Sequence, residues 1–335
     1  MALFWVHSIF TIQVSNFDDM KVCVTGSAGF IGSILASRLR SDGVELRLLT
    51  RQVIADNDEY FTADLTDNAA SLQGLLDDVE VIYHCAGETK NIAKMASLHV
   101  LGTRKMLDAV SNHIAATGKP LHWVQLSSVG AYGPPKGRAD TVREILETTE
   151  AAPVGEYEVT KTQADELIID YAQREPLFTY SILRPSIVIG KNMTNQSVRS
   201  LVNVIRRKLF FYIGSTSAVA TYVHVDDVVD ALVLCGTDVR AKGQIFNLSN
   251  DCKLSEVVAA VAQRAGIAAP TLCVPERLLR VLVNVFSYAG KIPLTQDRID
   301  AMVKRTRYSN EKIAKVLGYT PSRSIPRSIA SLFDE

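Results

Sequence analysis

The sequence predicts an α/β fold, a doubly wound parallel sheet with a smaller, mainly helical C-terminal substrate lobe. Over the first two-thirds of the 335 residues, short β-rich runs alternate with longer helical patterns. The first of these runs leads straight into a glycine-rich turn and then into a helical pattern. Strands that alternate with helices imply βαβ units, whose right-handed crossovers cover both faces of a parallel sheet.

The elements of the main sheet come first along the chain. Runs of aliphatic, β-branched and aromatic residues predict strands at 20–25, 44–50, 59–63, 79–84, 121–127 and 178–184. Apolar residues at helical spacing predict helices at 30–41, 68–77, 92–116 and 155–175. Right-handed crossovers between these strands give the doubly wound arrangement.

After about residue 185 strands and helices no longer alternate regularly, and helical patterns dominate. We expect short strands at 221–225 and 243–249. We expect helices at 195–209, 226–236, 254–265, 275–289, 294–304 and 309–317. Residues 186–335 are therefore interpreted as the substrate-binding lobe, with some segments returning to the main sheet. Residues 1–19 are expected to be a non-core extension, with Met20 as the natural start.

A glycine-rich loop follows the first strand. Gly26 permits the tight turn, Gly29 lets the backbone approach a pyrophosphate, and Gly32 lets the helix pack against the strand. The free N–H groups of the following helix attract phosphates. Residues 20–185 are thus predicted to form a dinucleotide-binding Rossmann domain. The loop residues expected at the cofactor are Gly26, Ala28, Gly29, Phe30, Ile31 and Gly32.

The end of the second strand bears on the choice between NAD and NADP. A carboxylate there would bind the ribose 2′-hydroxyl and repel a 2′-phosphate. The strand instead ends Leu48-Leu49-Thr50-Arg51, and Arg51 can pair with a 2′-phosphate. The alternative is a solvated Arg51 that stacks on the adenine. We expect NADP or NAD, with NADP favoured.

Two further strand ends lie where such a sheet binds its ligand. Asp64 and Leu65 follow the third strand. Asp64 either accepts a hydrogen bond from the adenine amino group or caps the predicted helix at 68–77. Small residues after the fourth strand would let the chain pass close to the cofactor, and these are Cys85, Ala86 and Gly87.

Tyr157 and Lys161 lie four residues apart on a predicted helix and so share one face. A tyrosine pKa near 10 is too high for a base at neutral pH, but a neighbouring ammonium and a positive nicotinamide ring stabilise the phenolate. Lys161 can also bind the nicotinamide ribose. Ser128, at the end of the fifth strand, can hydrogen-bond the substrate oxygen. Downstream of a dinucleotide loop, these residues predict a dehydrogenase site.

The motifs Thr25–Gly32, Ser127–Gly133, Tyr157–Lys161, Arg184–Val188 and Tyr222–Val228 resemble the extended short-chain dehydrogenase/reductase superfamily. Within it, the sequence resembles the nucleotide-sugar epimerase/dehydratase branch over about residues 20–320. The resemblance implies that Tyr157 is the acid/base, with Lys161 and Ser128 as its partners. It also implies that Pro185 packs against the nicotinamide, and that His224 lies in a structural strand–helix turn.

Two departures from the branch narrow the function. Val129-Gly130 follow Ser128, where dehydratases of the branch carry an Asp-Glu pair. Ala220-Thr221 stand where many sugar epimerases carry an arginine that binds the nucleotide diphosphate. Five other arginines could supply the positive charge for the diphosphate: Arg199, Arg206, Arg207, Arg298 and Arg305. The alternative for each is a solvated position on a helix face.

The resemblance implies NAD(P)-dependent hydride transfer at a carbinol or ketone of a nucleotide-linked sugar, by a 4-epimerase or a 4-keto reductase. One alternative is a 3β-hydroxysteroid- or dihydroflavonol-like oxidoreductase that acts on a lipophilic alcohol. The apolar helix at 278–286 would line its pocket, associate with a membrane surface or be buried in the core. A non-catalytic dinucleotide sensor is disfavoured because both Tyr157 and Lys161 are present.

Composition limits the partners and the compartment. The 36 basic and 36 acidic residues give no net charge, which argues against nucleic acid as the main partner. No apolar run approaches the length of a membrane span. The five cysteines contain no CxxC pair, which argues against a disulfide framework or a zinc site and favours the cytoplasm. A homodimer is expected through helices 92–116 and 155–175, with Leu98, Leu101, Ile168 and Ile169 exposed.

Overall fold

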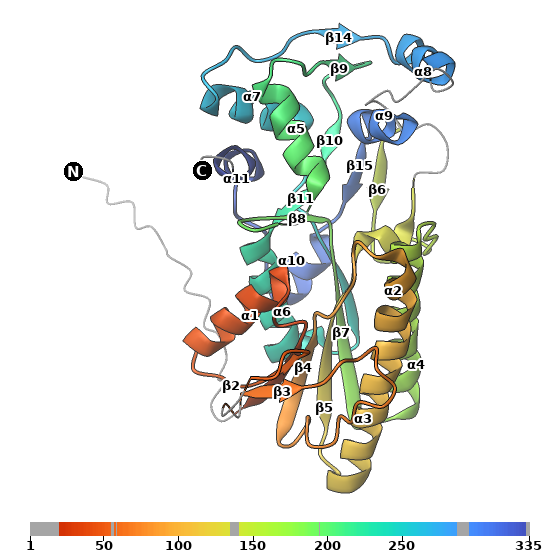
Figure 1. Cartoon of the computed structure of the whole chain (residues 1–335), viewed down its shortest axis with the longest axis vertical. Coiled ribbons are helices and arrows are strands. Elements are labelled where there is room, and N and C mark those ends of the chain that lie inside the picture. Colours follow the sequence, from red (N-terminus) through yellow and green to blue (C-terminus); the bar gives the residue numbers. More distant parts are fainter. Residues whose placement is uncertain are drawn as a thin grey trace, which may run out of the picture.

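A computed structural model describes residues 20–54, 57, 59–134, 141–193, 195–286 and 295–332. Its centre is a seven-stranded, wholly parallel sheet with the strand order β12-β7-β5-β4-β1-β2-β3 (Figure 1). This confirms the doubly wound α/β fold predicted from the sequence. The strands are β1 (Lys21–Thr25), β2 (Glu45–Thr50), β3 (Tyr60–Thr62), β4 (Val79–His84), β5 (Leu121–Leu126), β7 (Phe178–Pro185) and β12 (Gln244–Leu248).

Helices cover both faces of the sheet, which explains why its strands are apolar almost throughout. In β1, Val22 and Val24 face one helical layer and Cys23 faces the other, because side chains alternate along a strand. The first layer contains α1 (Phe30–Ser41), α6 (Val225–Thr237) and α10 (Glu311–Leu317). The second contains α3 (Thr103–Thr117) and α4 (Glu156–Arg174), on the opposite side of the sheet in Figure 1.

The prediction of a helix at 68–77 was wrong, because this segment forms successive turns. Asp67 accepts a hydrogen bond from the Ala69 N–H, Ser71 accepts one from the Gln73 N–H, and Gly74 has φ +81°. Such local bonds compete with the helical ladder. The apolar residues that suggested a helix are nevertheless buried: Leu72, Leu75 and Leu76 pack in the core against the sheet.

The predicted helix at 92–116 is interrupted. It consists of α2 (Ile92–Ala96), a π-helical segment η1 (Ser97–Gly102) and α3. The π-helical segment packs against α4, the helix that carries Tyr157 and Lys161. Single π-helical turns inside longer helices are often found at functional sites.

The lobe after β7 combines helices with two-stranded pairs. Its core is formed by α5 (Gln196–Arg206), α7 (Leu254–Arg264) and α11 (Ile325–Ser331). A second small core lies under α8 (Glu276–Phe286) and α9 (Gln296–Val303). Its strand pairs are β8 (Ile187–Ile189) with β11 (Tyr222–His224), β9 (Tyr212–Ile213) with β14 (Cys273–Val274), and β10 (Val219–Ala220) with β13 (Cys252–Lys253). A further pair joins β15 (Thr306–Tyr308) to β6 (Arg143–Ile145), which precedes β7 in the chain.

The expectation that Ile168 is exposed was wrong, because its side chain is fully buried in the core between α4 and the sheet. Leu101 is 51% exposed, whereas Leu98 and Ile169 are half-buried. The predicted extension at 1–19 lies outside the described residues. Within the described part of the chain, no helix combines the length and apolarity needed to cross a bilayer.

Candidate active site

The glycine loop has the shape that a dinucleotide pyrophosphate requires. Gly26 has φ +67°, and a Cβ there would lie 2.7 Å from backbone atoms of Cys85 and Ala86. A Cβ on Gly32 would lie 2.2 Å from the Gly26 carbonyl oxygen, so the helix could not approach the strand. Gly29, the N-cap of α1, makes no side-chain capping bond, and the first turn of α1 holds no acid. The N-terminus of α1 is therefore suited to an anion.

The segment after β4 lies directly against this loop. The Cys85 N–H donates to the Thr25 carbonyl at 3.2 Å, and the Ala86 N–H donates to the Thr25 hydroxyl at 3.2 Å. Cys85 and Lys161 are close enough for each to shift the other's pKa. The glycine loop, the end of β4 and Lys161 therefore meet at the carboxyl edge of the sheet, where doubly wound folds bind ligands.

The remaining predicted cofactor residues lie along the same edge. Asp64 Oδ1 accepts bonds from the Thr66 N–H and hydroxyl, both at 2.8 Å, and these bonds lower the pKa of Asp64. Asp64 thus closes a turn rather than capping a helix. The Leu65 side chain is buried in the core. Arg51 is exposed directly after β2, and Pro185 ends β7.

The three predicted catalytic residues come together at the end of β5 and the start of α4. Ser128 accepts a hydrogen bond from the Gly130 N–H at 3.1 Å, and its hydroxyl lies near enough to the Tyr157 side chain to lower the pKa of that phenol. Lys161 lies one turn further along α4 and is only 5% exposed. The Ser128 segment and the helix are about 30 residues apart in sequence, and the fold brings them into contact.

Burial dominates the electrostatics of this site. It raises the pKa of Tyr157 to about 12, the carboxylates of Glu158 and Asp165 add to the rise, and the Ser128 hydrogen bond opposes it. Burial also lowers the pKa of Lys161, which the Asp165 carboxylate opposes. The sequence suggested a pKa lowered by the ammonium, but in the protein alone Tyr157 is a neutral phenol at physiological pH.

Asp165 is a site-adjacent residue that the sequence reasoning missed. Its Oδ2 accepts hydrogen bonds from the Ser127 hydroxyl at 2.7 Å and from Arg184 Nη2 at 3.1 Å. Its carboxyl group is 1% exposed, and Oδ1 has no hydrogen-bond partner within the described chain. The signal was present, because Asp165 follows Lys161 by four residues and so shares its helix face.

The network continues from Arg184 across the sheet. The Arg184 guanidinium lies 5.1 Å from the centroid of the Tyr132 ring, and the Tyr132 hydroxyl donates to Asn247 Oδ1 at 2.7 Å. The short helix that carries Tyr132 begins at Val129, directly after Ser128. These bonds therefore tie the Ser128 loop to α4, β7 and β12.

His99, on the π-helical segment, was also missed. Its ring stands edge-on to Tyr157 with centroids 5.6 Å apart, and its Nε2 accepts a bond from the Glu88 N–H at 2.9 Å. Burial, with the charge of Lys161 second, lowers the pKa of His99 to about 4. The neutral ring therefore carries its proton on Nδ1 and donates it to the Thr160 hydroxyl at 2.8 Å. The wider π turn holds this ring against the helix of Tyr157.

The five candidate arginines occupy different surroundings. Arg206 and Arg207 are exposed at the far end of α5, Arg298 is exposed on α9, and Arg199 donates to the Met193 carbonyl at 3.3 Å. Arg305 is half-buried, and its Nε has no hydrogen-bond partner among the described residues.

Segments next to the catalytic loop hold Arg305 in place. Its carbonyl accepts a bond from the Arg143 N–H, and the Arg143 guanidinium donates to the carbonyls of Tyr132 and Gly133. His224 caps α6 through the Asp226 N–H at 3.2 Å. Ala220 and Thr221 are buried.

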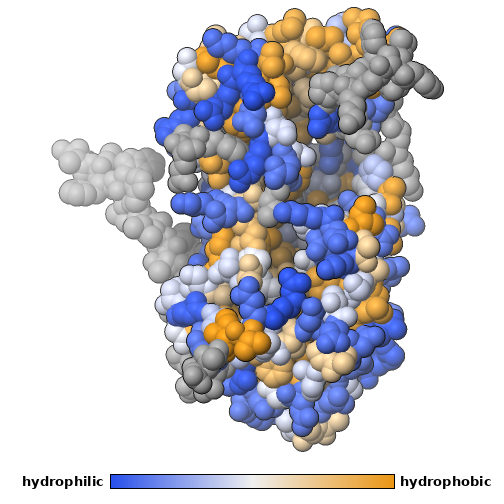
Figure 2. Space-filling model, in the orientation of Figure 1, coloured by the Kyte–Doolittle hydropathy of each residue, from blue (hydrophilic) through white to orange (hydrophobic). Residues whose placement is uncertain are grey.

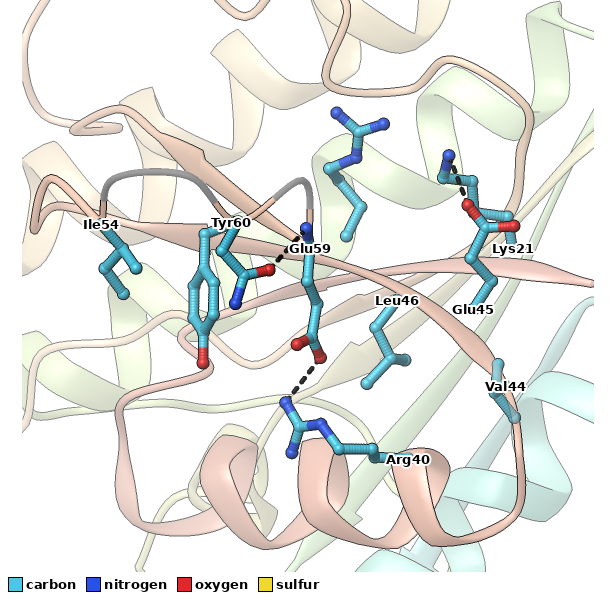
Figure 3. A pocket seen from close by; sticks show the side chains of 10 residues that line it. Lys21, Arg40, Val44, Glu45, Leu46, Ile54, Glu59 and Tyr60 are labelled. Carbon is cyan, nitrogen blue, oxygen red and sulfur yellow. Dashed lines mark hydrogen bonds and ion pairs between the residues drawn. The ribbon is translucent and has the colours of Figure 1, made fainter.

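A cavity of about 850 Å³ lies away from this site, beside the amino ends of β1 and β2 (Figure 3). Four of its charged residues form two ion pairs, Lys21 with Glu45 at 2.7 Å and Arg40 with Glu59 at 2.5 Å. Arg47 also lines the cavity, and its Nε has no hydrogen-bond partner among the described residues. Figure 2 shows the surface hollowed between the C-terminal lobe and the main domain. We place the candidate site on that side because the glycine loop and Tyr157 lie at the carboxyl edge of the sheet.

Residues 22–249 match the family model described as the NAD dependent epimerase/dehydratase family. The chain belongs to this family. It is similar to the UDP-glucose 4-epimerase of Mycolicibacterium smegmatis, with 27% identity over 93% of this chain and 96% of that protein. It is also similar to the 4-hydroxy-2-methyl-3-oxo-4-farnesyl-3,4-dihydroquinoline-1-oxide ketoreductase of Stigmatella aurantiaca, with 24% identity over 90% of this chain and 92% of that protein.

Solved structures share the fold. MoeE5 in complex with UDP-glucose and NAD superposes with a TM-score of 0.68 at 23% identity, over 93% of this chain and 97% of that one. RMD from Pseudomonas aeruginosa, complexed with NADPH, gives a TM-score of 0.64 at 20% identity, over 93% and 97%. The resemblance to extended short-chain dehydrogenases is thereby confirmed, and the protein is an enzyme of the NAD-dependent epimerase/dehydratase type.

Proposed function

We propose that this protein transfers hydride between a nicotinamide dinucleotide and C4 of a nucleotide-linked sugar, as a 4-keto reductase or a 4-epimerase. The observation that carries the proposal is the convergence of Ser128, Tyr157 and buried Lys161, where α4 packs against the short helix after Ser128, beside the glycine loop. A Tyr/Lys pair without such a loop would be only helix surface, and a loop without the pair would only bind a nucleotide.

The residues present fit a dinucleotide. The uncapped N-terminus of α1 and the close approach allowed by Gly26, Gly29 and Gly32 would hold the pyrophosphate. Exposed Arg51 would pair with a 2′-phosphate, which favours NADP. When bound, the nicotinamide supplies or accepts the hydride.

The protein's own residues handle the proton. Because Tyr157 is neutral at physiological pH, it is ready to donate a proton to the oxygen of a ketone, while Ser128 orients that oxygen. Lys161 stabilises the phenolate that remains. Oxidation needs the reverse transfer, which requires the Tyr157 pKa to fall when a positive ring is bound.

The charge for a nucleotide diphosphate would come from Arg305. It is the candidate that combines partial burial, a buried Nε without a partner among the described residues, and a connection to the Ser128 loop through Arg143. The Arg305 Nη2 donates to the Ser215 hydroxyl at 3.1 Å, so the Nε is the donor that an anion would satisfy.

A second candidate function is a ketoreductase for a lipophilic substrate. The observation in its favour is that two buried, uncharged residues, Ala220 and Thr221, stand where many sugar epimerases carry an arginine. The similarity to a ketoreductase named for a farnesylated quinoline oxide supports the same reading.

The test begins with the purified protein. Mass spectrometry after denaturation identifies any retained dinucleotide: tightly held NAD supports epimerase, and empty protein that binds NADPH supports reductase. NADPH or NADH oxidation is then measured with nucleotide-linked 4-keto sugars and with apolar ketones. Activity confined to apolar ketones would reject the sugar assignment.

Tyr157→Phe tests the catalytic assignment within this assay. It should abolish turnover while cofactor binding persists, because the ring remains and only the acidic hydroxyl is lost. Tyr180→Phe is the matched control, since that side chain is half-buried on β7 away from the glycine loop. Turnover retained by Tyr157→Phe would refute its role.

A further inference from the structure

Helix α8 is apolar on two faces, and the described structure uses only one of them internally. Leu279 and Val283 bury against Ile213, Ile299 and Val303. On the adjoining flank of the helix, Leu278 is 53% exposed, Val281 59% and Leu282 40%. Positions i, i+3 and i+4 form one continuous stripe along a helix, so these three side chains present a convex apolar ridge to the outside.

The neighbouring segments extend this apolar surface. The Tyr212 N–H of β9 donates to the Leu272 carbonyl at 2.8 Å. This bond connects β9, the strand after α5, to the residue that precedes β14 and α8. Leu209 is 64% exposed and Leu272 63%. Figure 2 shows apolar residues gathered along the top of the lobe, the end at which Figure 1 places β9, β14 and α8. We call this surface the lobe tip.

The lobe tip is basic in a protein without net charge. Arg206, Arg207 and Lys208 are exposed directly before Leu209, and Arg277 is exposed beside the α8 stripe. Of the acids at this end, Glu276 and Asp300 are both ion-paired with Arg280.

We propose that the lobe tip docks on the surface of an anionic lipid bilayer. An exposed apolar helix stripe that shares one end of a molecule with exposed cations is suited to a bilayer surface, since its apolar residues enter the headgroup boundary while the cations meet lipid phosphates. A second copy of this chain fits less well, because a symmetric contact would bring two basic tips together. This role is additional to the catalytic site and does not depend on its substrate.

The experiment is co-sedimentation of the full chain with phosphatidylcholine vesicles, with and without phosphatidylglycerol. We expect binding only to the anionic vesicles, and weaker binding as salt is raised. Each surface cation contributes about fivefold to partitioning, so Arg206→Gln/Arg207→Gln should weaken binding about 25-fold. Leu278→Ser/Val281→Ser should weaken it by at least about tenfold, because the inserting apolar groups are lost.

Val239→Ser is the matched control, since Val239 is 72% exposed on a short helix next to α6 and should leave binding unchanged. All variants should keep wild-type thermal unfolding, because the altered side chains are exposed. Absence of binding to anionic vesicles would overturn the proposal, as would wild-type binding by Leu278→Ser/Val281→Ser. If the wild-type chain forms a dimer and does not bind vesicles, and if Leu278→Ser/Val281→Ser disrupts that dimer, the lobe tip binds a second copy of the chain instead.

Discussion

Replacing Asp165 with asparagine removes one negative charge from the centre of the buried network and keeps the size of the side chain. The carboxylate lies between two cations, Arg184 through hydrogen bonds and Lys161 through its charge. Ser127 can still donate to the amide oxygen, so the perturbation acts mainly on the two cations.

The substitution should change both the free energy of unfolding and the pKa of Tyr157. Removing one partner of a buried ion pair typically destabilises a protein by about 3–5 kcal/mol, since the other charge stays buried without compensation. Asp165 also raises the pKa values of Tyr157 and Lys161. Eight residues along a helix separate Asp165 from Tyr157 by about 12 Å, where two charges interact by about 1.4 kcal/mol at an effective dielectric constant of about 20, or about one pKa unit.

In ketone reduction Tyr157 must be protonated, so activity is lost as pH rises through its pKa in the complex. Because Asp165→Asn lowers that pKa, the alkaline limb of kcat against pH should move down by about one unit. Asp170→Asn, an exposed acid on the same helix, should leave the limb in place.

Stability is measured by urea unfolding followed through the fluorescence of buried Trp123. A double-mutant cycle with Arg184→Met isolates the pair, and the double variant should recover much of the loss because both buried charges are then gone. An unchanged unfolding midpoint together with an unchanged alkaline limb would refute the reasoning.

Three further predictions concern the ligand sites. Arg51→Gln should raise KM for NADPH about tenfold and leave KM for NADH nearly unchanged, since one charge-assisted bond to a phosphate is lost; equal effects on both would reject the NADP assignment. Gly32→Ala should abolish dinucleotide binding measured by calorimetry, because its Cβ would lie 2.2 Å from the Gly26 carbonyl oxygen; unimpaired binding would contradict the loop geometry. Arg305→Met should raise KM for a nucleotide sugar by at least about tenfold with kcat less affected, whereas exposed Arg207→Gln should change neither; a fall in kcat alone would assign Arg305 to another role.

The parts of the fold that could be predicted are those encoded by neighbouring residues. Strands buried on both faces are apolar along their length, and the turn at Gly26 needs a residue without a Cβ. The spacing of Tyr157 and Lys161 places them on one helix face whatever the rest of the chain does. The helix predicted at 68–77 failed because turn-forming Asp67, Ser71 and Gly74 prevailed over an apolar spacing that fits both structures.

The sequence by itself therefore determined the parallel sheet, the glycine-rich turn after β1 and the shared helix face of Tyr157 and Lys161, because each depends on local spacing. The tertiary structure alone decided what surrounds them. It buried Ile168, brought Ser128 to Tyr157, joined Asp165 to Arg184 and set His99 edge-on to the catalytic ring. Each of these contacts depends on how two separately formed segments pack, and spacing within either segment carries no information about that packing.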